Sequence, residues 1–106
     1  MLNLLPQKPT AVLASNDLCA IGALHALQQK NVNVPGEISI IGFDDINFSR
    51  HTRPELTTVR IPRVEISRLA FEALSSTSDS ENGREWNVPT ELIIRMSTGP
   101  CTRSRS

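Results

Sequence analysis

The stretch that decides the fold is Ile38-Ser39-Ile40-Ile41-Gly42-Phe43, followed at once by Asp44-Asp45. It is rich in β-branched residues and almost free of polar ones. This pattern predicts a strand that is buried on both faces, which is typical of a parallel sheet covered by helices.

Further strands and helices are expected to alternate around this strand. The other expected strands are residues 10–14, 56–61 and 91–96, and the expected helices are residues 17–30 and 63–74. Residues 44–50 form a connection with a short helical turn, residues 75–87 a solvated loop, and residues 2–5 the apolar end of an element. Alternation of this kind predicts an α/β fold with three layers and a mostly parallel sheet.

The charge balance excludes some functions. Eleven Lys and Arg residues are balanced by eleven Asp and Glu residues in a chain of 106, so the formal net charge is zero. Binding to nucleic acid without sequence specificity is not expected, because it needs a clustered basic excess. The apolar runs are too short to cross a bilayer, and no basic segment followed by an apolar one suggests secretion.

Sequence signatures of catalysis are absent. The chain has no Gly-x-Ser-x-Gly elbow, Walker A loop, Gly-x-Gly-x-x-Gly turn or His-Glu-x-x-His helix. Its two Cys and two His residues are isolated from one another at spacings that do not suit a metal ion. We therefore expect no catalytic residue, no metal site and no cofactor, and an enzyme of flavodoxin-like layout is the weakest alternative.

Two polar side chains stand where a ligand site is expected. Asn16 follows the first strand and Asp44 the second. Ligands of open α/β sheets bind beyond the carboxyl ends of the strands. A carboxylate accepts from two hydroxyl groups, and an amide both donates and accepts, so the pair suits a polyhydroxylated ligand.

Plainer roles stay open for the same residues. Asn16 is suited to cap the following helix, which by itself is the simpler explanation, and Asp44 is equally suited to start a turn. Asp45 is expected to cap the short segment after it. Arg60 and Arg63 either reach the same edge of the sheet or are solvated charges.

Four blocks of the chain, in order and in register from about Pro9 to Pro100, resemble the LacI/GalR family of transcriptional regulators. The blocks are Pro9-Thr10-Ala11-Val12 with Asn16-Asp17 and Ala20-Ile21-Gly22-Ala23-Leu24; Val34-Pro35 with residues 38–45; Pro54-Glu55-Leu56-Thr57-Thr58-Val59-Arg60 with Pro62; and Glu91-Leu92-Ile93-Ile94-Arg95 with Ser97-Thr98.

The resemblance implies an organisation. The family places a helix-turn-helix DNA-binding module before an effector-binding core that is similar to a type I periplasmic sugar-binding protein, with two α/β lobes around the ligand. This chain resembles the C-terminal part of that core, without the helix-turn-helix. Residues 1–61 would belong to the C-terminal lobe, 62–87 to a crossover helix and loop, 88–100 to the C-terminal strand and 101–106 to a polar tail.

The resemblance also implies binding residues. Asn16 and Asp44 match positions that hydrogen-bond the effector, usually a sugar or a nucleoside. Ile61 and Arg63 fall at crossover positions that line the cleft, and Ile61 stands where many relatives carry Gln.

The partners implied by the resemblance are a second copy of the chain and DNA. The homodimer would form through the helix from Asp17 to Lys30 and the segment from Asn47 to Arg53. Operator DNA would be bound only through the missing N-terminal module. We expect a cytoplasmic repressor, not a membrane protein, and a fragment of a periplasmic-type solute receptor is the alternative. The wide apolar arc of the helix 63–74 lacks its partner lobe, so the isolated chain is expected to self-associate or to be poorly soluble.

Overall fold

A computed structural model describes residues 9–75 and 87–101 of the chain. The expected apolar start 2–5, residues 76–86 of the expected loop and residues 102–106 of the expected tail lie outside this part. The chain divides into a first compact unit, Met1–Arg60 with Leu92–Ser106, and a second compact unit, Ile61–Glu91.

Two pairs of strands are described in the structure. The strands are β1 (Ala11–Leu13), β2 (Ser39–Ile41), β3 (Thr58–Arg60) and β4 (Glu91–Ile93), and the parallel β1–β2 pair lies wholly in the first unit. β1 pairs with β2 in parallel, β3 pairs with β4, and two isolated parallel bridges connect the β2 segment with the β3 segment. The predicted α/β class with a mostly parallel sheet is confirmed.

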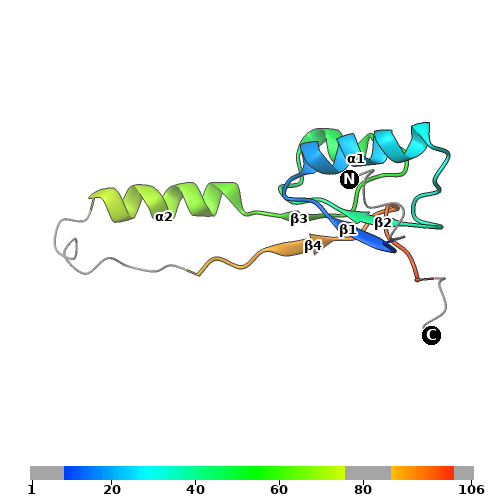
Figure 1. The fold of residues 1–106 in the computed structure, drawn as a ribbon. Coiled ribbons are helices and arrows are strands. Elements are labelled where there is room, and N and C mark those ends of the chain that lie inside the picture. Colours follow the sequence, from blue (N-terminus) through cyan, green and yellow to red (C-terminus); the bar gives the residue numbers. More distant parts are fainter. Residues whose placement is uncertain (1–8, 76–86, 102–106) are drawn as a thin grey trace. The chain divides into compact units, whose positions relative to one another are not determined.

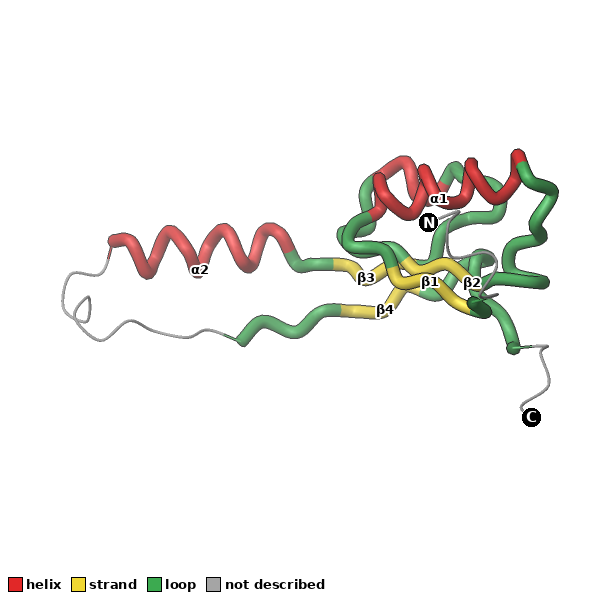
Figure 2. The backbone as a smooth tube through the Cα atoms, viewed as in Figure 1, coloured by secondary structure: helices red, strands yellow, loops and turns green. Residues whose placement is uncertain are grey.

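The helix α1 (Asp17–Gln29) packs against this sheet. It begins after Asn16, its N-cap, and ends before Asn31, whose φ of 58° is left-handed, as is common where a helix stops. One face of α1 is buried, because apolar residues recur at helical spacing. α1 lies along one face of the β1–β2 pair (Figures 1 and 2). The buried apolar core consists of Ala20, Leu24, Leu27, Ile38, Ile40 and Leu56.

The second unit contains the helix α2 (Arg63–Ser75). α2 begins at Arg63, directly after Pro62, as the sequence predicts. Its polar side carries Arg68, which pairs with Glu65 and Glu72 one turn before and after it. No α2 residue is buried. The apolar arc predicted for this helix is therefore exposed in the structure.

The strands are shorter than predicted, whereas each of the two α-helices agrees with its predicted range to within one residue. β2 ends at Ile41 instead of Phe43, because the backbone turns into left-handed conformations at Asp44 and Asp45. The expected helical turn is the 3-10 helix η2 (Asn47–Arg50). Within the described residues, no helix is long and apolar enough to cross a membrane.

Candidate functional site

The carboxyl ends of β1 and β2 lie side by side. The strands are in register from Ala11 opposite Ser39 to Leu13 opposite Ile41. Beyond them, the Ala14 N–H donates to the Ile41 carbonyl and the Asp17 N–H to the Phe43 carbonyl, each at 2.9 Å. Residues 14–17 and 42–45, which we call the rim, are thus two adjacent segments, and they carry Asn16 and Asp44 at one edge of the sheet.

Asn16 caps α1, as the simpler interpretation predicts. Its backbone is extended, and its side-chain Oδ1 accepts a hydrogen bond from the Cys19 N–H at 2.8 Å. The cap fixes the direction of the amide group at the rim.

Asp44 and Asp45 adopt unusual backbone conformations. The φ angles are 125° at Asp44 and 56° at Asp45. The Asp44 N–H donates to the carbonyl of Val59 at 2.9 Å, which ties this turn to β3. Left-handed conformations of residues other than glycine persist only where the surroundings enforce them, and they cluster at ligand-binding sites.

Asp45 forms ion pairs, so the prediction that it caps the following segment is wrong. Ile46 is the N-cap of η2, and it makes no side-chain cap hydrogen bond. The Asp45 carboxylate receives Arg60 Nε at 2.8 Å and Arg95 Nη2 at 2.6 Å. Burial alone would raise the pKa of Asp45, but the hydrogen bonds and charges of Arg95 and Arg60 outweigh it and hold this pKa below its ordinary value.

Asp17, the first residue of α1, is a second buried carboxyl group. It is fully buried. Oδ1 accepts from Thr58 Oγ1 at 2.6 Å, and Oδ2 accepts from the Ile46 N–H at 2.9 Å and from Ser49 Oγ at 2.5 Å. Asp17 thus fastens the start of α1 to η2 and to β3. No local pattern reveals this role, because its partners lie 29 to 41 residues away.

An apolar hollow adjoins the polar rim. Leu13, Ala14, Ser15 and Phe43 line a volume of about 380 Å³. Leu13 is 75% exposed and Phe43 is 37% exposed. The sequence predicts Leu13 inside a buried strand, but in the described structure β1 lies at an edge of the sheet. Polar and apolar groups therefore stand next to each other at the carboxyl ends of the strands.

The other two predicted binding residues belong to the second unit. Ile61 is half-buried and directly follows β3, whereas Arg63 is the exposed first residue of α2. Their part in a ligand site stays a prediction.

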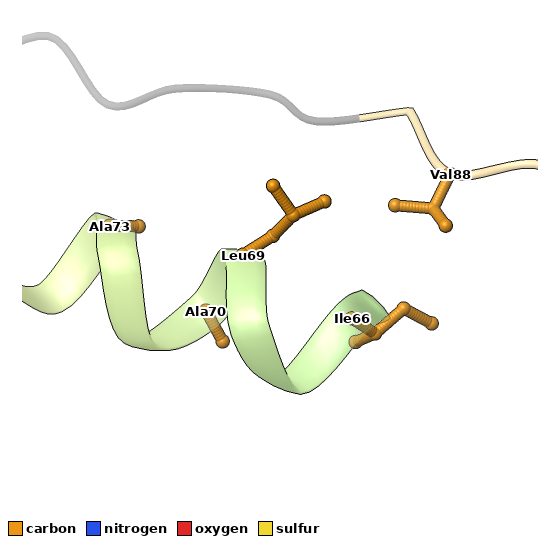
Figure 3. Close-up of a pocket in the computed structure, with 5 residues that line it drawn as sticks. All are labelled: Ile66, Leu69, Ala70, Ala73 and Val88. Carbon is orange, nitrogen blue, oxygen red and sulfur yellow. The ribbon is translucent and has the colours of Figure 1, made fainter. Parts of the chain in front are cut away.

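A second hollow, of about 430 Å³, lies within the second unit along α2. It is lined by Ile66, Leu69, Ala70, Ala73 and Val88 (Figure 3). All five side chains are apolar. Ligand sites usually contain a few polar groups that orient the ligand, so this surface is more typical of packing against another part of a protein.

Metal-binding groups do not gather in the part of the chain that the structure describes. Among residues 9–75 and 87–101, no three His, Cys, Asp or Glu side chains are placed to hold a metal ion.

Comparison with known proteins identifies the family of the chain. The family described as periplasmic binding protein-like domain matches residues 1–98. The probable HTH-type transcriptional repressor ExuR of Bacillus subtilis is 47% identical over 100 residues, which is 92% of this chain and 30% of that protein. The ribose operon repressor of Haemophilus influenzae is 36% identical over 92 residues, covering 85% of this chain and 28% of that protein.

The fold has the same relatives. The crystal structure of the lac repressor dimer bound to operator and the anti-inducer ONPF matches with a TM-score of 0.79 and 28% identity, over 91% of this chain and 35% of that one. This chain therefore belongs to the periplasmic binding protein-like domain family, as part of the effector-binding core found in LacI/GalR regulators. It spans about 30% of the length of the curated relatives that it matches.

Proposed function

We propose that this chain is the ligand-sensing part of a LacI-type transcriptional repressor and that its rim binds a sugar or a nucleoside. The observation that carries the proposal is the placement of Asn16 and Asp44 on adjacent segments at the carboxyl ends of two parallel strands. The name of the ribose operon repressor supports a sugar as the ligand, and the anti-inducer bound to the lac repressor supports a small molecule as the effector.

Each group at the rim has a chemical role in this proposal. The Asp44 carboxylate accepts from two neighbouring hydroxyl groups of the ligand. The side-chain oxygen of Asn16 already accepts the helix-cap hydrogen bond from the Cys19 N–H, so Asn16 would offer the ligand the N–H donors of its amide group. The exposed Phe43 and Leu13 side chains offer an apolar wall for the nonpolar face of a sugar ring or a base.

The remaining ligand contacts and the division of the chain follow the family pattern. Ile61 and Arg63 would line the cleft from the crossover. Residues 1–61 would form the C-terminal lobe, 62–87 the crossover helix and loop, and 88–100 the C-terminal strand. Effector binding would change the relative orientation of two lobes and thereby the affinity of a dimer for its operator, through a DNA-binding module outside these 106 residues.

The surface formed by α1 and η2 supports self-association. Leu18 is 71% exposed and Phe48 is 60% exposed. The hydrogen bonds of Asp17 to Ile46 and Ser49 keep the start of α1 against η2, so both apolar side chains come from neighbouring segments. We place the homodimer contact on α1 and on residues 47–53.

A periplasmic-type solute receptor remains the second candidate, because the same rim chemistry serves transport proteins of this fold. The regulator is preferred because the curated relatives are transcriptional repressors. That relationship also favours a cytoplasmic protein without enzymatic activity.

The experiment compares Asp44→Asn with Glu37→Gln in the intact regulator. Both substitutions neutralise one carboxylate, but Glu37 precedes β2 at the opposite end of the strand. Each lost hydrogen bond between a hydroxyl group and a charged acceptor is worth about 1.5–3 kcal/mol. Two such bonds predict a loss of effector affinity of at least about 100-fold for Asp44→Asn, with operator binding unchanged.

Isothermal titration with ribose and with adenosine measures the effector affinity, and operator retention on a gel measures DNA binding. Glu37→Gln is expected to behave like the unmodified protein in both assays. An unchanged effector response in Asp44→Asn would refute the assignment of the rim as the ligand site.

A further inference from the structure

The Asp45 carboxylate is withdrawn from solvent beside the rim. The Asp45 side chain is only 3% exposed, and the Arg95 side chain that it contacts is 9% exposed. Arg95 is itself fixed, because its Nη1 donates to the Leu56 carbonyl at 2.8 Å and its N–H donates to Thr57 Oγ1 at 2.9 Å. The ion pair therefore joins two well-anchored groups.

Arg60 and Arg95 lie on the two chain segments that connect the units. Arg60 is the last residue of the first unit before the chain enters the second unit at Ile61. Arg95 follows shortly after the chain returns to the first unit at Leu92. One carboxyl group thus binds both the outgoing and the returning segment.

Asp45 is also continuous with the residue that carries the proposed ligand contact. The Asp44 N–H is bonded to the Val59 carbonyl, and the Asp45 N–H lies 3.3 Å from Thr58 Oγ1. Left-handed backbone is unfavourable for residues other than glycine, so this turn at Asp44 and Asp45 persists only if neighbouring contacts enforce it. The two arginines at Asp45 are the strongest contacts available there, since charged hydrogen bonds exceed neutral ones.

We propose that Asp45 is a positioning residue, which holds the backbone of Asp44 in place at the rim and joins it to both connecting segments. The proposal rests on the proposed function in one respect, namely that Asp44 contacts the ligand. Asp45 thus connects the turn that carries Asp44 to Arg60 and to Arg95 through side-chain contacts.

The test compares the full chain with its Asp45→Asn variant by amide hydrogen exchange, resolved by residue with NMR. A positioning role predicts exchange at least about tenfold faster at the Asp44 and Arg95 amides, from local opening of the turn. The Ala14 and Ser39 amides of the β1–β2 pair are expected to stay within about twofold. Two results would overturn the proposal: uniform acceleration at all four amides, which indicates a general loss of stability, or no acceleration at Asp44.

A second variant keeps the test decisive if Asp45→Asn does not fold. Arg60→Gln removes the bond to Oδ2 from a side chain that is 42% exposed, and it leaves the Arg95 pair intact. Exchange at Asp44 should again rise, whereas exchange at Arg95 should change less. Glu37→Gln is the matched control, with exchange unchanged at both. No ligand enters these measurements, so their outcome is independent of whether the proposed effector function is right.

Discussion

Replacing Gly42 by alanine tests the packing around the buried Asp17 carboxyl group. A Cβ at Gly42 would lie 2.2 Å from Asp17 Oδ1 and 3.0 Å from Leu56 Cδ2. Ordinary van der Waals contact begins near 3.4 Å, so the carboxyl group would have to move by about 1 Å. Its oxygens are bonded to Thr58, Ile46 and Ser49, and a shift of this size breaks at least one of these bonds.

The cost follows from two contributions. Overpacking a core costs about 1–3 kcal/mol, and an unsatisfied buried polar group costs about 1–3 kcal/mol. Gly42→Ala should therefore lower the free energy of unfolding by about 2–6 kcal/mol. A domain of this size has about 5–15 kcal/mol in total, so the melting temperature should fall by at least about 10 °C.

The same substitution at Gly22 is the matched control. A Cβ there meets nothing within 4 Å, and the residue lies inside α1. Alanine in place of glycine within a helix is worth about 1 kcal/mol, so Gly22→Ala should be neutral or stabilising. Urea titrations followed by far-ultraviolet circular dichroism, repeated at several concentrations, measure both variants. A Gly42→Ala midpoint equal to that of the unmodified chain would refute the packing argument.

Two other predictions address charge and association. Ion pairing lowers the pKa of Asp45, so the ionised carboxylate stabilises the folded chain fully above the ordinary Asp pKa of about 3.9, and this stabilisation is lost as the pH falls below that value. Urea midpoints measured between about pH 6 and pH 2 should therefore decline less in Asp45→Asn than in the unmodified chain. Equal pH dependences of the two proteins would contradict the pairing. Leu18→Lys with Phe48→Lys should shift the chain towards monomer in sedimentation velocity, more than Val64→Lys on α2 does; a smaller shift would place the association surface on α2 instead.

Much of the fold follows from the sequence, because its signals are local. Periodicity and the Asn16 cap predict α1 to within one residue, and the continuous β-branched run predicts β2. The end of β2 is not predictable in this way, since it depends on left-handed backbone at Asp44 that only long-range contacts enforce.

The candidate site likewise has residues that local sequence signals predict and residues whose roles depend on long-range contacts. The sequence places Asn16 and Asp44 at one edge of the sheet, since the parallel direction of the strands is all that this requires. It assigns Asp45 to a cap because Asp is common there, whereas two arginines, one of them 50 residues away, determine its actual role. Burial of Asp17 and exposure of Leu13 likewise depend on which segments become neighbours.

The absence of buried residues in α2 has a thermodynamic consequence for the chain. A helix of 13 residues gains little from propensity alone and is marginal in water unless tertiary contacts cover its apolar side. Its helix–coil equilibrium is therefore set by whatever packs over Ile66, Leu69 and Ala73. The helical content of α2 should therefore report on assembly. It should be low when the chain is dilute, and it should rise when another part of a protein covers the apolar surface of α2.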